Sequence, residues 1–503
     1  MPRLSASTLT SLSPSVWTPR YDRAAVRPGI VHLGVGGFHR SHQAFYVDRL
    51  LESGRAGDWG ICGVGVLPGD RRMAAVMAAQ DCLYTLVVKH PDGYLDARVV
   101  GSIVEYLFAP DDPEAVVERM AAEVTRIVSL TVTEGGYNTS AATGEFDADA
   151  PAVRADLAAG AAPRTSFGLV VEALARRRAR GLPPFSVVSC DNIPHNGDLA
   201  RRSFAAFAAL RDPELGEWVA AEVPFPNSMV DRITPVTTDD DRAELASRFG
   251  VEDAWPVVCE PWTQWVLEDA FPGGRPPVED VGVQVVADVA PYELMKLRLL
   301  NAGHQVLAHL GRLAGLTYVH EACQDPLFRE FLRGYLDEEA TPTLAPVPGI
   351  DLRRYKAELV GRFANPQVRD TLDRIRENAS DRVPQFLLPV IRANLERGGE
   401  IRRSAAVLAG WARTAEGDDD AGLPLALVDP RAGELGARAD RQAAEPLAFL
   451  GDPDVFGDLA ADPRLAASYR WALTSLRERG ARATVADLVG PARRAAARPA
   501  SPG

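Results

Sequence analysis

The stretch Ile30-Val-His-Leu-Gly-Val-Gly-Gly-Phe-His-Arg40 decides how this chain folds. It opens with a nearly continuous apolar run, as in a strand that is buried on both faces of a parallel sheet. A tight glycine turn follows, and then a helical pattern from Arg40 to Ser53. Backbone amides in such a turn can hold a dinucleotide pyrophosphate. We therefore predict a cofactor-binding turn formed by Gly34, Gly36, Gly37, Phe38 and Arg40, with Arg40 supplying a charge.

The same alternation of short apolar runs and helical patterns continues to about residue 210, which predicts an α/β fold with a parallel sheet. Two further runs, Leu83 to Lys89 and Tyr94 to Val100, flank a turn-forming cluster and predict a hairpin insertion. The other predicted strands are Trp59 to Val66, Ile127 to Thr133 and Phe185 to Cys190. The other predicted helices are Asp112 to Arg126, Thr165 to Arg180 and Gly197 to Leu210.

A second domain of mostly helical character is predicted from residue 286 to 503, after a first domain at 1–285. The breaker Phe271-Pro-Gly-Gly-Arg-Pro-Pro277 precedes the boundary, and long helical patterns follow it. Residues 416–422 are predicted to form an exposed loop and residues 491–503 a frayed tail. The predicted helices are Pro291 to Leu313, Pro326 to Leu336, Leu352 to Arg362, Gln367 to Glu377, Gln385 to Glu396 and Arg402 to Thr414.

Polar residues and glycines follow the predicted strands, where ligands bind in open α/β sheets. Asp70 follows the second strand and could accept the two ribose hydroxyls of NAD, whereas Arg71 and Arg72 could instead bind the phosphate of NADP. NAD is therefore the predicted cofactor, with NADP not excluded. Glu134 follows the third strand and Asn192 the fourth. Each of these residues singly is also compatible with a cap or a solvated loop.

The chemistry is predicted to lie on the apolar helix that contains Lys296. At about 100° per residue, Asn301 and His304 lie about 140° and 80° from Lys296, so the three share one arc of the helix. Burying them is costly unless they contact one another, a substrate or water. The chain has 55 Lys and Arg residues, of which only three are Lys. Unlike Arg, a buried Lys amine can lose its proton, so Lys296 is a candidate base.

Oxidation of a secondary alcohol requires such a set of groups. A base takes the hydroxyl proton, hydride leaves for a nicotinamide, and amide donors hold the developing oxyanion. Asn301 and Asn192 could be those donors, and His304 could orient a hydroxyl. The chain has no HExxH motif and its eight His residues show no ligand spacing, so we predict a reaction without a metal.

Several long motifs, in order, resemble those of the mannitol dehydrogenase family of long-chain polyol dehydrogenases. This resemblance implies a Rossmann-type N-terminal domain and a mostly α-helical C-terminal domain. It makes Lys296 the general base, Asn192 and Asn301 the oxyanion pair, and Glu134 a gate for proton exchange. It also implies that His304, Asp231, Arg374 and Arg382 contact the polyol. The motifs are the glycine turn, Ser129 to Tyr137, Cys190 to Pro194, Phe225 to Pro235 and Lys296 to His304.

The leading hypothesis is an NAD-dependent oxidoreductase that interconverts a polyol and a ketose, either mannitol and fructose or arabitol and xylulose. A hexuronate reductase, such as fructuronate reductase, and a non-catalytic nucleotide-binding sensor are the alternatives. The net charge of −13 argues against nucleic acid and anionic lipid as partners. Five Cys without a CxxC pair and no long apolar run favour a soluble, cytoplasmic protein. A monomer is compatible with the sequence, which does not define the oligomeric state.

Overall fold

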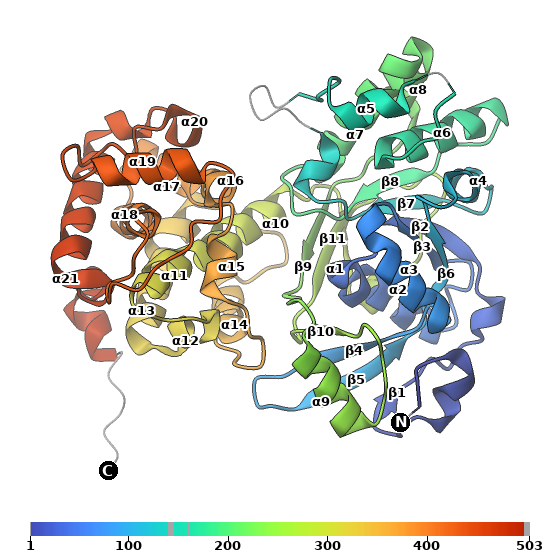
Figure 1. Ribbon diagram of the computed structural model, residues 1–503, viewed down its shortest axis with the longest axis horizontal. Coiled ribbons are helices and arrows are strands. Elements are labelled where there is room, and N and C mark those ends of the chain that lie inside the picture. The colour runs from blue at the N-terminus through green and yellow to red at the C-terminus, as the bar shows by residue number, and fades with distance from the viewer. Residues whose placement is uncertain (1, 139–144, 159, 497–503) are drawn as a thin grey trace. The chain divides into compact units, whose positions relative to one another are not determined.

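The computed structural model describes residues 2–138, 145–158 and 160–496 of the 503-residue chain. The chain forms two compact units, Met1–Ala290 and Pro291–Gly503. The first is an α/β unit and the second is built almost entirely from helices (Figure 1).

A five-stranded sheet in which every pair of neighbours is parallel forms the centre of the first unit. Its strand order is β6-β3-β2-β7-β8, so chain order reverses at β2, as in a Rossmann fold. In register, Ile30 of β2 pairs with Ile61 of β3 and with Ile127 of β7. The strands are β2 (Pro28–Leu33), β3 (Gly60–Gly65), β6 (Ile103–Phe108), β7 (Ile127–Leu130) and β8 (Ser186–Ser189).

Helices cover both faces of this sheet and build two hydrophobic cores. On one face α4, α6 and α7 pack against side chains such as Val31 and Val128. On the other face α2 and α3 pack against Ile30 and Ile61 (Figure 1). The helices of the unit are α1 (Gly37–Ser41), α2 (Gln43–Glu52), α3 (Arg71–Ala79), α4 (Pro113–Ala121), α5 (Pro151–Asp156), α6 (Ser166–Ala179), α7 (Asn196–Arg211), α8 (Pro213–Glu222) and α9 (Asp239–Phe249).

Two smaller sheets complete the unit. The predicted hairpin forms as an antiparallel pair and lies in a sheet of order β1-β5-β4-β10. A third sheet has the order β12-β11-β9, and its β9 ends at Asp231. The strands are β1 (Val16–Trp17), β4 (Tyr84–Lys89), β5 (Leu95–Val100), β9 (Ser228–Asp231), β10 (Val257–Cys259), β11 (Gln264–Glu268) and β12 (Gln284–Val286).

Sequence patterns missed the edge strand β6, which supplies the third strand of the Rossmann order. Only its first residue is fully buried, and Glu105 and Tyr106 interrupt its apolar run, so it lacks the signature of a central strand. The predicted helix at 112–126 ends early, because the backbone of Ala122 is extended. The helix predicted at 40–53 is divided at His42, whose backbone is not helical.

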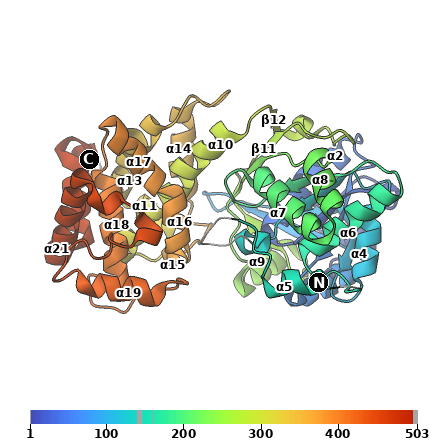
Figure 2. The same cartoon turned by 90° about the horizontal axis from the view of Figure 1, so that it is seen from above.

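The helical unit is arranged around α11 (Ala302–Leu313), which is buried along nearly all its length. Helix α11 packs against α12, α13, α15, α16, α18 and α21, and Figure 2 shows it between them. The surrounding helices are α12 (Val319–Gln324), α13 (Pro326–Gly334), α14 (Leu352–Phe363), α15 (Leu372–Arg376), α16 (Ala379–Phe386), α17 (Leu388–Arg397), α18 (Arg402–Ala415), α19 (Ala432–Arg441), α20 (Pro453–Phe456) and α21 (Pro463–Ala496).

The structure corrects two expectations about this unit. The predicted helix at 367–377 forms only over α15, because residues 365–371 are not helical and the Thr371 side chain caps the helix. The tail predicted from residue 491 is wrong up to residue 496, where α21 ends after kinks at Gly480 and Gly490. Residues 497–503 lie outside the described part of the chain.

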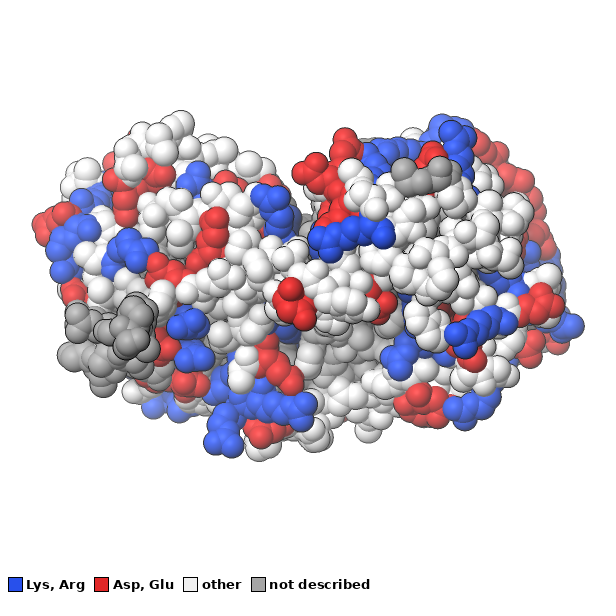
Figure 3. Space-filling view, turned by 90° about the horizontal axis from the view of Figure 1, so that it is seen from below, with Lys and Arg blue, Asp and Glu red and all other residues white. Residues whose placement is uncertain are grey.

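Surface charge is mixed on the face drawn in Figure 3, where Lys and Arg side chains alternate with Asp and Glu. Many of the described Arg residues form ion pairs, such as Arg176 with Glu114 and Glu118. In the described ranges, no helix combines the length and the hydropathy that crossing a bilayer requires.

Two features fix the glycine turn and helix α2 that follow β2. Gly34 has φ +92°, and a Cβ atom there would lie 2.2 Å from the Thr131 carbonyl oxygen. In α2, Asp48 Oδ1 accepts hydrogen bonds from the Gly101 N–H (2.9 Å) and the Tyr21 hydroxyl (2.7 Å). Asp48 therefore ties α2 to the segment between β5 and β6.

Gly34→Ala is expected to destabilise the α/β unit by about 2 kcal/mol or more, since alanine meets both an unfavourable φ and a backbone clash. Gly57→Ala is the matched control: no atom lies within 4 Å of its added Cβ, and its φ is outside the left-handed region. We expect the control to stay within about 0.5 kcal/mol of wild type. Urea denaturation followed by tryptophan fluorescence measures both, and equal midpoints for the two variants would contradict this account of the turn.

Asp48→Asn should change how stability depends on pH. Burial raises the pKa of Asp48 to about 6, against the hydrogen bonds from Gly101 and Tyr21. A raised pKa means that the folded state holds the proton more tightly than the unfolded state. The contribution of protonated Asp48 to the free energy of unfolding is therefore complete below about pH 4 and is lost as pH rises through about 6. Between pH 4 and pH 7 the free energy of unfolding of the wild type should fall by up to about 3 kcal/mol relative to that of the variant. Thermal melting of both proteins at several pH values tests this prediction. A difference in melting temperature that stays constant across these pH values would contradict it.

Candidate functional site

The glycine turn after β2 leaves room for a ligand beside its backbone. A Cβ on exposed Gly36 would have only the Gly34 carbonyl oxygen nearby, at 4.0 Å, whereas one on Gly37 would contact Val257 and Thr234. Gly36 is therefore the open position and Gly37 a packing position. This division matches the roles of glycines in dinucleotide-binding turns.

Arg40 lies inside the protein behind this turn, and Phe38 is partly buried. Arg40 is 1% exposed, and its guanidinium donates to the carbonyls of Gly36 (3.3 Å) and Trp255 (2.5 Å). The half-buried Phe38 ring stacks on His42 at 4.9 Å. In this conformation the guanidinium of Arg40 is directed to two backbone carbonyls and braces the turn from within.

Asp70 follows β3 in the short helix η3 (Pro68–Asp70). Its Oδ2 accepts hydrogen bonds from the backbone N–H groups of Val66 and Leu67, both at 2.9 Å. The guanidinium of Arg71 is held by both carboxylate oxygens of Asp111, at 2.6 and 3.1 Å. An acid is therefore fixed at the end of the second strand while the adjacent cation is directed to a protein carboxylate.

The loops after β7 and β8 are joined by Asp191, a role that sequence reasoning did not identify. Its carboxylate accepts from the N–H groups of Val132 (3.2 Å) and Thr133 (2.9 Å) and from the Tyr137 hydroxyl (2.8 Å). Asp191 is 7% exposed, and the next residue, Asn192, is exposed. Asp191 therefore fixes the loop that carries Asn192. The signal available in the sequence was its position directly after a buried strand.

Two predicted residues remain to be placed in the α/β unit. Asp231 ends β9, is 3% exposed, and accepts a 3.0 Å hydrogen bond from the Trp262 indole N–H. The backbone of Glu134 begins the short helix η4 (Glu134–Tyr137), but its side chain lies outside the described atoms.

In the helical unit, the three residues predicted to carry the chemistry are all buried, each less than 10% exposed. Residues Lys296–Asn301 form a π-helical segment, η6, between α10 (Ala290–Met295) and α11. The Ala302 N–H donates to the carbonyl of Leu297, five residues earlier, and also to that of Leu299. This register places residues five apart on one side, so Lys296 and Asn301 lie closer in direction than the 140° of a regular helix.

His304 lies in the first turn of α11 and stacks on the ring of Phe363, with ring centroids 4.1 Å apart and planes at 21°. Phe363 ends α14 and was not identified from the sequence. Its flat contact restricts rotation of the imidazole, so the histidine has a defined orientation.

The two predicted arginines are linked through α15. Arg374 forms a two-point ion pair with Asp370, with its Nε 2.6 Å from Oδ1. Arg382 donates from α16 to the carbonyls of Arg374 (3.0 Å) and Ile375 (3.2 Å). Arg382 therefore holds the backbone of the helix that presents Arg374. Within the described residues, no group of three or more His, Cys, Asp and Glu side chains could hold a metal ion.

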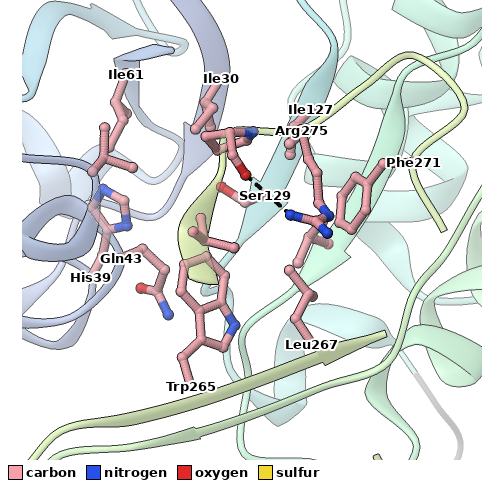
Figure 4. Close-up of a pocket in the computed structure, with 14 residues that line it drawn as sticks. Ile30, His39, Gln43, Ile61, Ile127, Ser129, Trp265, Leu267, Phe271 and Arg275 are labelled. Carbon is pink, nitrogen blue, oxygen red and sulfur yellow. Dashed lines mark hydrogen bonds between the residues drawn. The ribbon is translucent and has the colours of Figure 1, made fainter. Parts of the chain in front are cut away.

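A cavity of about 30 Å³ lies on the α2 face of the five-stranded sheet (Figure 4). Most of its lining residues are apolar, and the polar side chains of His39 and Gln43 point toward it together with Ile30, Ile61 and Trp265. Burial lowers the pKa of His39 well below its usual value, which keeps that ring neutral. The volume suits about one water molecule and is too small for a dinucleotide.

Two family models match the chain in sequence. The mannitol dehydrogenase Rossmann domain matches residues 28–280, and the mannitol dehydrogenase C-terminal domain matches residues 288–477. A mannitol 2-dehydrogenase of Phaeosphaeria nodorum is 48% identical over 489 residues, which cover 96% of this chain and 85% of that protein.

Two solved structures are similar throughout. Pseudomonas fluorescens mannitol 2-dehydrogenase, in a ternary complex with NAD and D-mannitol, is 45% identical with a TM-score of 0.89, covering 97% of this chain and 99% of that chain. A D-sorbitol dehydrogenase in substrate-free form is 40% identical, also with a TM-score of 0.89, covering 96% and 100%. The matches over both units show that this chain belongs to the mannitol dehydrogenase family.

Proposed function

We propose that this protein is an NAD-dependent polyol dehydrogenase, which transfers hydride from a secondary alcohol carbon to the nicotinamide and leaves a ketose. The observation that carries the proposal is the buried π-helical turn that presents Lys296 and Asn301 on one side, next to an oriented His304. The Rossmann order of the sheet and the open backbone at Gly36 support a dinucleotide as the second substrate. Bound NAD would supply the hydride acceptor.

Lys296 is proposed to act as the general base that accepts the hydroxyl proton from the substrate. The amides of Asn192 and Asn301 are proposed to donate hydrogen bonds to the oxygen as negative charge develops on it. His304, Asp231 and Arg374 are proposed to bind other hydroxyls, with Arg382 in a supporting role and Glu134 in proton exchange with solvent. An amine and two amides together stabilise the alkoxide, so the proposed reaction uses no metal.

D-Mannitol, with D-fructose as product, is the proposed substrate pair, and D-arabitol with D-xylulose is the second candidate. The names of the relatives favour a polyol over a hexuronate. The decisive experiment measures NADH formation with mannitol, arabitol and sorbitol, and NADH consumption with fructose and fructuronate, all in the presence of EDTA. Turnover with a polyol supports the proposal. Turnover with fructuronate alone, or NADH binding without turnover, would overturn it.

Lys296→Arg and Lys296→Ala should each lose about 10²–10⁴-fold in kcat, because guanidinium does not accept a proton at working pH and alanine has no base. Lys356→Arg is the matched control, since Lys356 pairs with Asp337 at 2.6 Å, an interaction that Arg can also make. Steady-state assays and NADH fluorescence titration separate turnover from cofactor binding. A Lys296→Arg protein that binds NADH and stays within a few-fold of wild type would shift the role of base to His304.

Wild type should use NAD with a higher kcat/KM than NADP, because the Asp70 carboxylate repels a ribose phosphate and Arg71 is held by Asp111. Asp70→Ser should raise the NADP-to-NAD ratio of kcat/KM at least about tenfold, since it removes the charge and leaves a hydroxyl for the ribose. Asp92→Ser, in the turn between β4 and β5, should leave the ratio unchanged. A wild type that prefers NADP would show that Asp70 does not select the cofactor.

A further inference from the structure

The π-helical turn η6 has an unusual backbone conformation. It carries Lys296 and Asn301, two residues of the proposed catalytic site. A π segment is rarer than an α-helix and usually lasts a single turn, so other parts of a protein must hold it in place. Here η6 is one six-residue segment between two regular helices, α10 and α11. The groups that stabilise this π register therefore help to determine the directions in which the Lys296 and Asn301 side chains leave the helix.

A second π segment, η7 (Tyr335–Ala340), follows α13 and packs against η6. Tyr335 is fully buried, and its hydroxyl donates a 3.0 Å hydrogen bond to the backbone carbonyl of Arg298. Arg298 lies within η6, between Lys296 and Asn301. The contact therefore acts on the main chain of the turn itself.

Arg298 is also held through its side chain by the segment that follows η7. Its Nη1 donates a 2.6 Å hydrogen bond to the carbonyl of Thr343 in η8 (Thr341–Thr343). Backbone and guanidinium of one residue are thus fixed from the same continuous stretch, residues 335–343. Two contacts on one residue restrict both rotation and translation of the turn.

This stretch is itself anchored. Glu339, in η7, is fully buried and its carboxylate accepts hydrogen bonds from the backbone N–H groups of Arg403 (2.8 Å) and Ser404 (2.9 Å). Both donors lie in the first turn of α18, whose orphan N–H groups require such partners. The segment η7, which carries Tyr335, is therefore held in place by α18.

We propose that Tyr335 is a positioning residue that keeps η6 in its π register and thereby holds Lys296 and Asn301 on one side of the helix. This proposal rests on the proposed function for its catalytic consequence, whereas its structural part concerns the backbone alone. Loss of the hydroxyl leaves a buried carbonyl without this donor, which favours rearrangement of the turn toward the regular helical register. In that register Asn301 turns away from Lys296.

The test compares Tyr335→Phe with Tyr469→Phe. Tyr469 is also fully buried in the helical unit, and its hydroxyl donates to Gln442. Each variant removes one buried hydroxyl that donates one hydrogen bond, so the two are matched in chemistry and burial. We expect Tyr335→Phe to lower kcat for polyol oxidation about three- to tenfold, with KM and NADH affinity within about twofold. Tyr469→Phe should keep the wild-type kcat.

Amide hydrogen exchange gives a second readout that needs no substrate. The peptide covering residues 294–306 should exchange faster in Tyr335→Phe than in wild type or Tyr469→Phe. Unchanged exchange there, or equal kcat values for the two variants, would overturn the positioning role. Wild-type protein without polyol turnover would overturn the proposed function, and faster exchange confined to Tyr335→Phe would still support the structural part.

Discussion

The parallel pairing of β2 with both β3 and β7 is the constraint on which the α/β unit depends. It brings the carboxyl ends of neighbouring strands to one edge of the sheet, so the loops that follow them lie side by side. Gly34 can make its turn only without a Cβ atom, because the Thr131 carbonyl, in the loop after the paired strand, occupies that space. The pairing therefore determines both where a ligand can approach and which residue must stand at the turn.

In the helical unit the comparable constraint is the register of η6. A regular helix would direct Lys296 and Asn301 apart, whereas hydrogen bonds spanning five residues place them on one side. Both side chains are buried, and a buried polar group costs free energy unless it has a hydrogen-bond partner. An amine and an amide on one side of a buried turn can both face one ligand oxygen.

Patterns in the sequence predicted what depends on local composition, and failed where distant parts of the chain determine the backbone. The buried strands β2, β3, β7 and β8 were recognisable because both faces of each are covered. The edge strand β6 was not, since half-buried strands resemble other amphipathic segments. The arc of Lys296, Asn301 and His304 was found with a helical period, but no local signal marks the π turn. Its support comes from residues 335–343, some forty positions later.

The three Lys residues of the chain lie in two kinds of setting. Lys89 lies within 3.2 Å of Asp241 and Glu244, and Lys356 pairs with Asp337, so simple ion pairing explains both. Composition alone therefore does not identify a reactive amine. Lys296 differs in its setting, a buried turn of unusual backbone with a neighbouring amide and a stacked imidazole. Lys89 is also largely buried, but its amine faces two carboxylates, which favour the protonated form, whereas Lys296 lies beside an amide and a ring.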